Sequence, residues 1–357
     1  VYSYITRTYA MTTLRLGIDI GSTTIKFVVL DENAKIIYKN YERHFSETGN
    51  AFKRNLEKVA PVLGDNPFYI TLSGSSGMGV ASRLNLPFEQ EVLSCTSAIN
   101  LLAKDTETAI ELGGEDAKIT YLKGSLEQRM NGACAGGTGA FIDQMANLLN
   151  TDAKGLNDLA KKGSKLYTIA SRCGVFAKTD IQALINDGAQ KEDLALSIFQ
   201  AVVNQTVGTL AQGRTIEGKT AFLGGPLTFL SELKERFIKT LNLIDEDVVA
   251  TPDACYFVAI GAAICDEAKL TSLKELTELS KTDLNVVTET KNHSAPLFSS
   301  RDEYDAFVKR HSEDIVKRTS FDNYHGPVYV GIDAGSTTSK IAAVTDKNEL
   351  LYTIYGS

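Results

Sequence analysis

Short apolar runs separated by polar turns recur along most of the chain. Residues 14–31 form an apolar strand, break at a polar Gly-Ser-Thr-Thr turn and resume as a second strand, which predicts a β-hairpin. Further strands are predicted near residues 69–73, 108–112, 118–122 and 220–223. Apolar spacings of three and four residues predict helices at residues 140–150, 193–217 and 254–269. Strands that alternate with helices indicate an α/β fold.

One of these patterns occurs twice. Residues 328–344, VYVGIDAGSTTSKIAAV, repeat residues 14–30, LRLGIDIGSTTIKFVVL, almost position for position. Such an internal repeat indicates a duplicated domain. We expect an N-terminal extension (1–13), an ATPase-type domain (14–270) and a charged connector (271–327) with a helix over 304–318. Residues 328–357 are interpreted as the start of a second, truncated ATPase-like domain, of which only the first hairpin is present. The two lobes of the first domain are expected at about 14–100 plus 254–270 and about 101–253.

Composition narrows the classes of function. The chain has 357 residues, 43% of them hydrophobic, enough to fill more than one core. Its net charge of -7 disfavours binding to nucleic acid or anionic membranes, since basic faces drive both. We see no apolar run of the roughly 18 residues that a membrane helix needs, and no signal peptide, and therefore expect a cytoplasmic protein. Five cysteines, an odd number, argue against a disulfide framework.

Three glycine-containing turns are candidates for phosphate and nucleotide binding. Asp19 precedes the turn Gly21-Ser22-Thr23-Thr24, which offers backbone and hydroxyl donors beside a carboxylate suited to Mg²⁺. Alone, this turn could equally be a capped hairpin. A second acidic turn, residues 111–118, follows the strand at 108–112, and a third, Gly224-Gly225-Pro226, ends a strand before a helix. Together the three predict a nucleotide site.

The order of these turns resembles that of the acetate kinase, sugar kinase, heat-shock chaperone and actin superfamily. The resemblance implies an actin-like ATPase fold, in which two ribonuclease-H-like lobes close over ATP. A GxxxxGK[ST] loop is missing from the sequence, which argues against a P-loop fold. We predict that Asp19 holds Mg²⁺ directly or through water, and that Glu111, with Glu115 or Asp116 as alternatives, orients the attacking water.

Two cysteines lie in glycine-flanked turns where packing alone does not call for sulfur. Cys134 stands in NGACAGGTGAF and Cys173 in ASRCGVFAKTD, each just before a predicted helix. Amide donors at a helix start favour a thiolate, the form that binds iron. Cys95, Cys255 and Cys265 are interpreted as packing residues. Because a four-iron cluster usually takes four thiolates, two copies of the chain would have to share one cluster.

The ordered segments closely resemble the activator ATPases of 2-hydroxyacyl-CoA dehydratases and the related ATPase subunits of benzoyl-CoA reductases. The resemblance covers about residues 14–270 and rests on these segments: GIDIGSTTIK, LSGSSGMG, VLSCTSA, ELGGEDAK, NGACAGGTGAFIDQMA, ASRCGVFAKTDI, FLGGP and AIGAA. It implies a homodimer in which Cys134 and Cys173 of each subunit hold one shared 4Fe-4S cluster. It also implies ATP/ADP and Mg²⁺ as cofactors, ferredoxin or flavodoxin as electron donor and a 2-hydroxyacyl-CoA dehydratase-like protein as acceptor.

The predicted site residues follow from the turns and the resemblance together. The catalytic residues are expected to be Asp19 and Glu111. The residues expected to bind the nucleotide are Gly21, Ser22, Thr23, Thr24, Lys26, Gly113, Gly114, Glu115, Gly136, Gly137, Thr138, Gly139, Gly224, Gly225 and Pro226. Two features depart from the smaller activators: Glu111 stands where they have Asp, and they lack a second ATPase-like copy. The duplication looks like the large members of the family.

Two other functions fit the same cleft. A small-molecule kinase of the sugar or acetate kinase type would treat both cysteines as bystanders, but the sequence offers no further base for an acceptor hydroxyl. A nucleotide switch of chaperone or filament type would signal by lobe closure and would also leave the cysteines unexplained. The redox activator is therefore the leading hypothesis.

Overall fold

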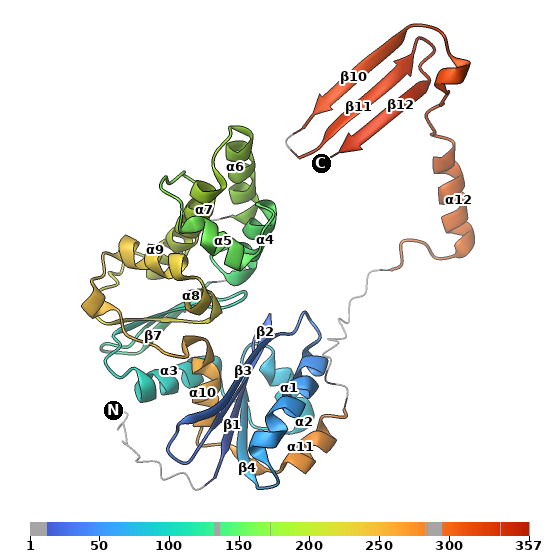
Figure 1. Ribbon diagram of the computed structural model, residues 1–357. Helices are drawn as coiled ribbons and strands as arrows, with labels where there is room; N and C mark the ends of the chain where they lie inside the picture. The colour runs from blue at the N-terminus through green and yellow to red at the C-terminus, as the bar shows by residue number, and fades with distance from the viewer. Residues whose placement is uncertain are drawn as a thin grey trace. The chain divides into compact units, whose positions relative to one another are not determined.

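The structure of the protein is a computed structural model that describes residues 13–131, 136–171, 173–282, 284, 295–335 and 337–356. The chain divides into two compact units, Val1–Val286 and Val287–Ser357 (Figure 1). The first unit contains the predicted nucleotide-binding turns.

The first lobe of the first unit is built on a five-stranded sheet of order β3-β2-β1-β4-β9. Its strands are β1 (Arg15–Ile20), β2 (Thr24–Leu30), β3 (Ile36–Arg43), β4 (Phe68–Ser73) and β9 (Lys269–Thr271). Strands β1 and β4 are parallel, and the remaining pairs are antiparallel. One face packs on α1 (Thr48–Leu63), α2 (Gly77–Leu84) and α11 (Leu273–Leu279), around a core that includes Phe27, Phe52 and Leu276.

The second lobe repeats this strand order in a four-stranded sheet, β7-β6-β5-β8. Its strands are β5 (Thr108–Leu112), β6 (Ala117–Tyr121), β7 (Glu127–Met130) and β8 (Thr220–Leu223). Strand β5 is parallel to β8 and antiparallel to β6, as β1 is to β4 and β2. The outer face packs on α4 (Gly139–Leu148), α5 (Ala153–Ala160), α6 (Gly174–Asn186), α7 (Lys191–Thr206) and α9 (Ser231–Leu241). The lobes are thus two copies of one topology.

Two helices fill the space between the sheets. Helix α3 (Glu91–Leu102) packs on α10 (Phe257–Ala263), and their buried residues share one core with both sheets. This core joins Val28 of β2, Ile99 of α3, Leu223 of β8 and Phe257 of α10. Because it is common to both lobes, it fixes the mutual position of the strand ends that carry the turns.

The second lobe contains one long apolar helix that the sequence pattern did not predict as a possible membrane span. Among the described residues, Lys191–Ala211 is a single helix that is long and apolar enough to cross a membrane. In the structure 72% of its most apolar window is buried. The segment comprises α7 and a π-helical turn, Val207–Ala211, and its side chains form the centre of the second-lobe core.

Several element boundaries differ from the prediction. The helix expected over 254–269 is a 3-10 turn, Ala254–Tyr256, followed by α10, and Lys269 belongs to β9, where it pairs with Ile70. The helix expected over 193–217 ends earlier, because Gln212 has a left-handed conformation with φ of 48°. The predicted boundary at residue 270 lies inside the first unit, since Leu276 of α11 is fully buried in the first-lobe core.

The second unit contains α12 (Arg301–Ser312), a 3-10 turn (Phe321–Asn323) and a sheet of order β10-β11-β12. Helix α12 is shorter than the predicted helix over 304–318. The strands are β10 (Val328–Ala334), β11 (Ser339–Thr345) and β12 (Leu350–Gly356), one strand more than the expected hairpin. Asp333 lies opposite Lys340 in this sheet, the same register that places Asp19 opposite Lys26 in the first lobe.

Candidate nucleotide-binding site

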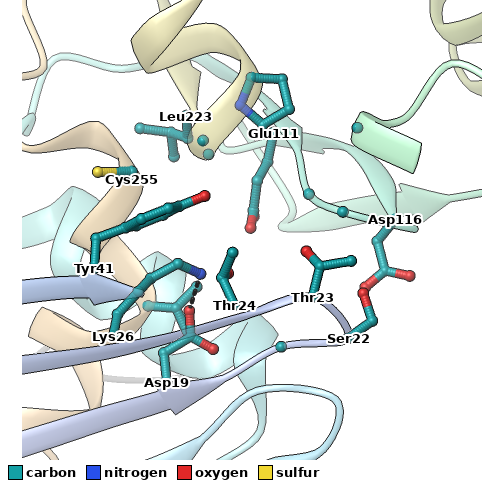
Figure 2. A pocket seen from close by; sticks show the side chains of 18 of the residues that line it. Asp19, Ser22, Thr23, Thr24, Lys26, Tyr41, Glu111, Asp116, Leu223 and Cys255 are labelled. Carbon is teal, nitrogen blue, oxygen red and sulfur yellow. Dashed lines mark hydrogen bonds and ion pairs between the residues drawn. The ribbon is translucent and has the colours of Figure 1, made fainter. Parts of the chain in front are cut away.

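A cleft in the first unit collects residues from the three predicted turns. It encloses about 670 Å³, part of it open solvent. Its walls come from the β1–β2 turn, the β5–β6 turn, the end of β8 and the start of α10 (Figure 2). The lining residues are Asp19, Gly21, Ser22, Thr23, Thr24, Lys26, Tyr41, Arg43, Glu91, Glu111, Gly113, Gly114, Asp116, Gly139, Leu223, Gly224, Gly225, Pro226, Ala254, Cys255, Phe257 and Val258.

The first two turns meet directly across the cleft. Each is closed by a backbone hydrogen bond, from Gly21 N–H to Thr24 O at 2.9 Å and from Gly113 N–H to Asp116 O at 2.7 Å. A Cβ on Gly114 would overlap Thr23 Oγ1, so a side chain at position 114 would separate the turns. The two turns together present backbone N–H groups and hydroxyls to one space, which is the chemistry that a phosphate chain requires.

The third turn supplies an apolar, backbone-lined wall. Gly224 has φ of +86°, and a Cβ there would overlap the Leu112 carbonyl. The next residue, Gly225, faces Tyr41 of β3, whose hydroxyl would lie 2.6 Å from an added Cβ. Glycine at both positions therefore lets the third turn pack directly against Leu112 and Tyr41.

Asp19 and Lys26 form a buried ion pair at the floor of the cleft. Asp19 is 1% exposed, and its Oδ2 lies 2.5 Å from Lys26 Nζ (Figure 2). Burial alone lowers the pKa of Lys26, but the Asp19 carboxylate outweighs it and holds the pKa well above its ordinary value. Asp19 Oδ1 is buried without a hydrogen-bond partner among the described residues. A lone carboxylate oxygen of this kind fits Mg²⁺ or a water of its shell.

Glu111 approaches the same space from the second lobe, with its carboxylate directed toward the Asp19–Lys26 pair (Figure 2). Lys118 Nζ lies 3.7 Å from Glu111, 3.8 Å from Asp116 and 2.8 Å from Glu91. Burial, followed by the nearby Glu111 carboxylate, raises the pKa of Glu91 to about 7, against the lowering effect of Lys118. The second turn therefore carries more acid than base.

Most of the predicted nucleotide-binding residues line the cleft, but four do not. Glu115, Gly136, Gly137 and Thr138 are absent from the lining, and Asp116, the alternative for water positioning, is present. Thr138 is fully buried as the N-cap of α4. The start of α4 is hydrogen-bonded to the second turn: Gly139 N–H donates to Gly113 O at 3.0 Å, and Ala140 N–H donates to Gly114 O at 2.8 Å.

Of the two predicted cluster ligands, the structure describes Cys173. Cys134 lies outside the described residues. Cys173 is half-buried at the N-cap of α6, and Asp180 of the same helix accepts the Ala170 N–H at 2.8 Å, which holds the preceding loop. A Cβ on Gly174 would lie 3.6 Å from Phe141 of α4, so the start of α6 packs beside the start of α4. Within the described residues, no three His, Cys, Asp or Glu side chains are grouped to hold a metal.

Sequence reasoning missed five polar or aromatic residues of the cleft: Tyr41, Arg43, Glu91, Cys255 and Phe257. Tyr41 and Arg43 lie at the end of edge strand β3, where alternation does not distinguish a cleft from solvent. Glu91 could have been noticed, since Cys95 follows it by one helical turn in α3. Cys255 was read as a packing residue. Burial raises the pKa of its thiol to about 11, which leaves it protonated.

Two lobes of the same topology, with a cleft lined by glycine-containing turns between them, define the actin-like ATPase fold. Component A of the (R)-2-hydroxyglutaryl-CoA dehydratase of Acidaminococcus fermentans has this fold with a TM-score of 0.62 at 24% identity, over 75% of this chain and 100% of that chain. The activator of the 2-hydroxyisocaproyl-CoA dehydratase of Clostridium difficile, solved with bound ADPNP, gives a TM-score of 0.59 at 23% identity, over 79% and 100%. The predicted fold class is confirmed.

The chain belongs to the BadF/BadG/BcrA/BcrD ATPase family, whose family model matches residues 16–265. The 2-hydroxyisocaproyl-CoA dehydratase activator of Clostridioides difficile is 30% identical over 262 residues, 71% of this chain and 96% of that protein. The family predicted from the sequence motifs is thereby confirmed. The match covers the cleft and both cysteine segments.

Proposed function

We propose that this protein is an ATP-dependent reductive activator, which uses ATP binding and hydrolysis to drive the transfer of one electron to a 2-hydroxyacyl-CoA dehydratase-like partner. Membership of an ATPase family supports the hydrolytic half of the proposal. Relatives named as dehydratase activators support the other half. The observation that carries the proposal is the packing of the Cys173 helix against α4, the helix bound to the second phosphate turn.

The proposed site of hydrolysis is the cleft itself. Asp19 would hold Mg²⁺ directly or through water by its free Oδ1, while its Oδ2 contacts the Lys26 ammonium at 2.5 Å. The turns at Gly21–Thr24 and Gly113–Asp116 would bind the phosphates. Glu111 would accept a hydrogen bond from the water that attacks the γ-phosphate, breaking its bond to ADP. Such catalysis is mainly positioning and charge stabilisation.

Cys134 and Cys173 are the proposed ligands of a 4Fe-4S cluster shared by two copies of the chain. Such a cluster, when bound, supplies a one-electron carrier, which ferredoxin or flavodoxin would reduce. The described thiol fits this role, since Cys173 is half-buried beside two exposed apolar residues, Val175 (72% exposed) and Phe176 (66% exposed). An apolar surface around a partly open thiol fits an interface with a second copy.

A continuous set of contacts would couple the cleft to the cysteine helices. Thr23 of the first turn packs on Gly114 of the second, and Gly113 and Gly114 accept hydrogen bonds from the first turn of α4. Phe141 of α4 packs on Gly174 of α6. A nucleotide that draws the two phosphate turns together would therefore displace the helices that follow Cys134 and Cys173.

Anaerobic iron and sulfide analysis with electron spin resonance, with and without ATP, tests the proposal. We expect a brown protein with about four irons per dimer. Cys134→Ser and Cys173→Ser should each bleach it, whereas the matched control Cys265→Ser, which changes a thiol in the first lobe, should retain the iron. A colourless wild-type protein that hydrolyses ATP fully after anaerobic reconstitution would exclude the redox role.

A further inference from the structure

The repeated topology places two acid–lysine pairs at equivalent positions, one in each lobe. Asp19 lies opposite Lys26 in the β1–β2 ladder, and Glu111 lies opposite Lys118 in the β5–β6 ladder. The first lysine contacts its acid at 2.5 Å. The second lies 3.7 Å from its acid and instead contacts Glu91 at 2.8 Å. The two hairpins thus differ in the partner of the lysine, because Glu91, which belongs to neither hairpin, binds Lys118.

Glu91 comes from the helix between the lobes. It is the first residue of α3, lines the cleft and has 22% of its side chain exposed, against 4% for Lys118. The charged groups around it come from four strands and one turn: Lys118 on β6, Glu111 on β5, Asp19 on β1, Lys26 on β2, and Asp116, which is bound to Lys118. Lys118 is the cation that it contacts among the described residues.

The same face of α3 also carries a thiol close to Glu111. Cys95 follows Glu91 by four residues, one helical turn, and burial, followed by the nearby Glu111 carboxylate, raises the pKa of its thiol, which leaves it a neutral donor. A thiol is a much weaker donor than an ammonium. Helix α3 therefore replaces a strong charged partner of Glu111 by a weak neutral one.

We propose that Glu91 is a positioning residue for ATP hydrolysis, which draws the Lys118 ammonium away from Glu111 and leaves Glu111 free to bind the attacking water. This inference rests on the proposed hydrolysis of ATP in this cleft. A carboxylate in full contact with an ammonium loses basicity and a lone pair. In the reaction ATP and water give ADP, phosphate and one proton, and a Glu111 kept free of Lys118 can take that proton and pass it to solvent.

The test compares kcat and KM for ATP across pH in the full chain. In the wild type, kcat should rise through about pH 7, because Glu91 then ionises and forms its ion pair with Lys118. Glu91→Gln should lower kcat about tenfold and abolish this rise, with KM for ATP changed less than about twofold, because Lys118 then stays on Glu111. Glu91→Asp, which keeps the charge, should retain the rise.

A second variant asks whether Glu91 acts through Lys118. The double variant Glu91→Gln/Lys118→Met removes the ammonium that Glu91→Gln releases, so it should regain most of the lost kcat. The matched control is Glu89→Gln, which removes a charge two residues away, where Glu89 accepts a hydrogen bond from Ser94 at 2.6 Å and does not contact Lys118. The control should keep the wild-type pH profile.

The outcomes separate this inference from the proposed function. A wild-type chain that does not hydrolyse ATP would overturn the proposed function. A wild-type chain that hydrolyses ATP, together with a Glu91→Gln variant that matches Glu89→Gln in kcat and pH profile, would overturn the inference alone. If Glu91→Gln does not fold, Glu91→Asp and the double variant decide: loss of the pH rise in Glu91→Asp, or no activity in a folded double variant, would contradict it.

Discussion

Arg43 at the end of β3 forms an ion pair with Asp143 of α4, with 2.5 Å between Nη2 and Oδ2. The pair joins the first lobe to the helix whose N-terminus is hydrogen-bonded to the second turn of the cleft. Both side chains are partly exposed, at 48% and 34%, so the pair contributes little to stability. Its consequence is geometric: it favours the arrangement in which the two lobes are close enough to share the cleft.

Asp143→Asn should weaken the link between the cleft and α4. We expect the free energy of unfolding to change by less than about 1 kcal/mol, since exposed pairs are weak. The protection of α4 amides (Gly139–Leu148) that a non-hydrolysable ATP analogue induces should fall, as measured by hydrogen exchange. The control is Asp158→Asn, which breaks the exposed Lys161–Asp158 pair of α5, 3.2 Å apart. Equal protection in both variants would rule out this link.

Asp19→Asn should abolish activity and also destabilise the protein. The substitution leaves the Lys26 ammonium buried beside a neutral amide, which costs about 3 kcal/mol. Loss of the metal-binding carboxylate should lower kcat more than about a hundredfold. Thermal unfolding and ATP turnover, measured with and without Mg²⁺, test both effects.

The double variant Asp19→Asn/Lys26→Met separates the two effects of that change. Removing the unpaired ammonium should restore most of the unfolding free energy, while activity stays lost. The single variant Lys26→Met serves as the control for the loss of the lysine. Recovery of turnover in the double variant would show that Asp19 does not hold the metal.

The turns of the cleft could be predicted from sequence because each is a local pattern. In the first turn, a strand and Asp19 precede the glycine and hydroxyls of Gly21–Thr24. In the second turn, a strand precedes the glycines and acids of Gly113–Asp116, so both hairpins can be recognised within a few residues of sequence. The strand ends were also local, since apolar runs such as those of β5 and β8 end at paired glycines, Gly113-Gly114 and Gly224-Gly225. The confirmed fold class followed from the order of these turns along the chain.

Other features depend on contacts distant in sequence. Glu91 enters the cleft because α3 packs on α10, which follows it by more than a hundred residues. Lys269 belongs to a strand because Phe68–Ile70 offers it a sheet edge, although its local pattern continues a helix. Leu276 extends the first unit past the predicted boundary for the same reason, by packing into a core formed elsewhere.

The stability of the protein should fall as pH rises between about 4.5 and 7. The folded-state pKa of Glu91 is about 7, raised from the ordinary 4.5 by burial and by Glu111. Within this window the folded state binds more protons than the unfolded chain, so the unfolding free energy declines with rising pH. The decline should amount to roughly 1 to 3 kcal/mol and be complete above pH 7.

Urea unfolding at pH 5, 6, 7 and 8 measures this decline. Glu91→Gln should remove the part of the pH-dependent decline in unfolding free energy that is due to Glu91, because the amide does not titrate. Glu89→Gln should leave the plot of unfolding free energy against pH parallel to that of the wild type. If the unfolding free energy of Glu91→Gln declines with pH as steeply as that of the wild type, a group other than Glu91 binds the proton responsible for the decline.

Phe176→Asp should prevent two copies from associating around the Cys173 segment. Phe176 is 66% exposed on the first turns of α6, so the substitution should change the free energy of unfolding by less than about 0.5 kcal/mol. In a dimer interface, however, it would bury a charge without a partner, which costs several kcal/mol. Anaerobic light scattering should then report a monomer, and iron per chain should fall with it, because one copy supplies only two thiolates.

Leu126→Asp is the matched control, at an exposed residue (46%) of the β6–β7 turn. A Phe176→Asp protein that remains a dimer with full iron content would place the shared interface elsewhere on the molecule.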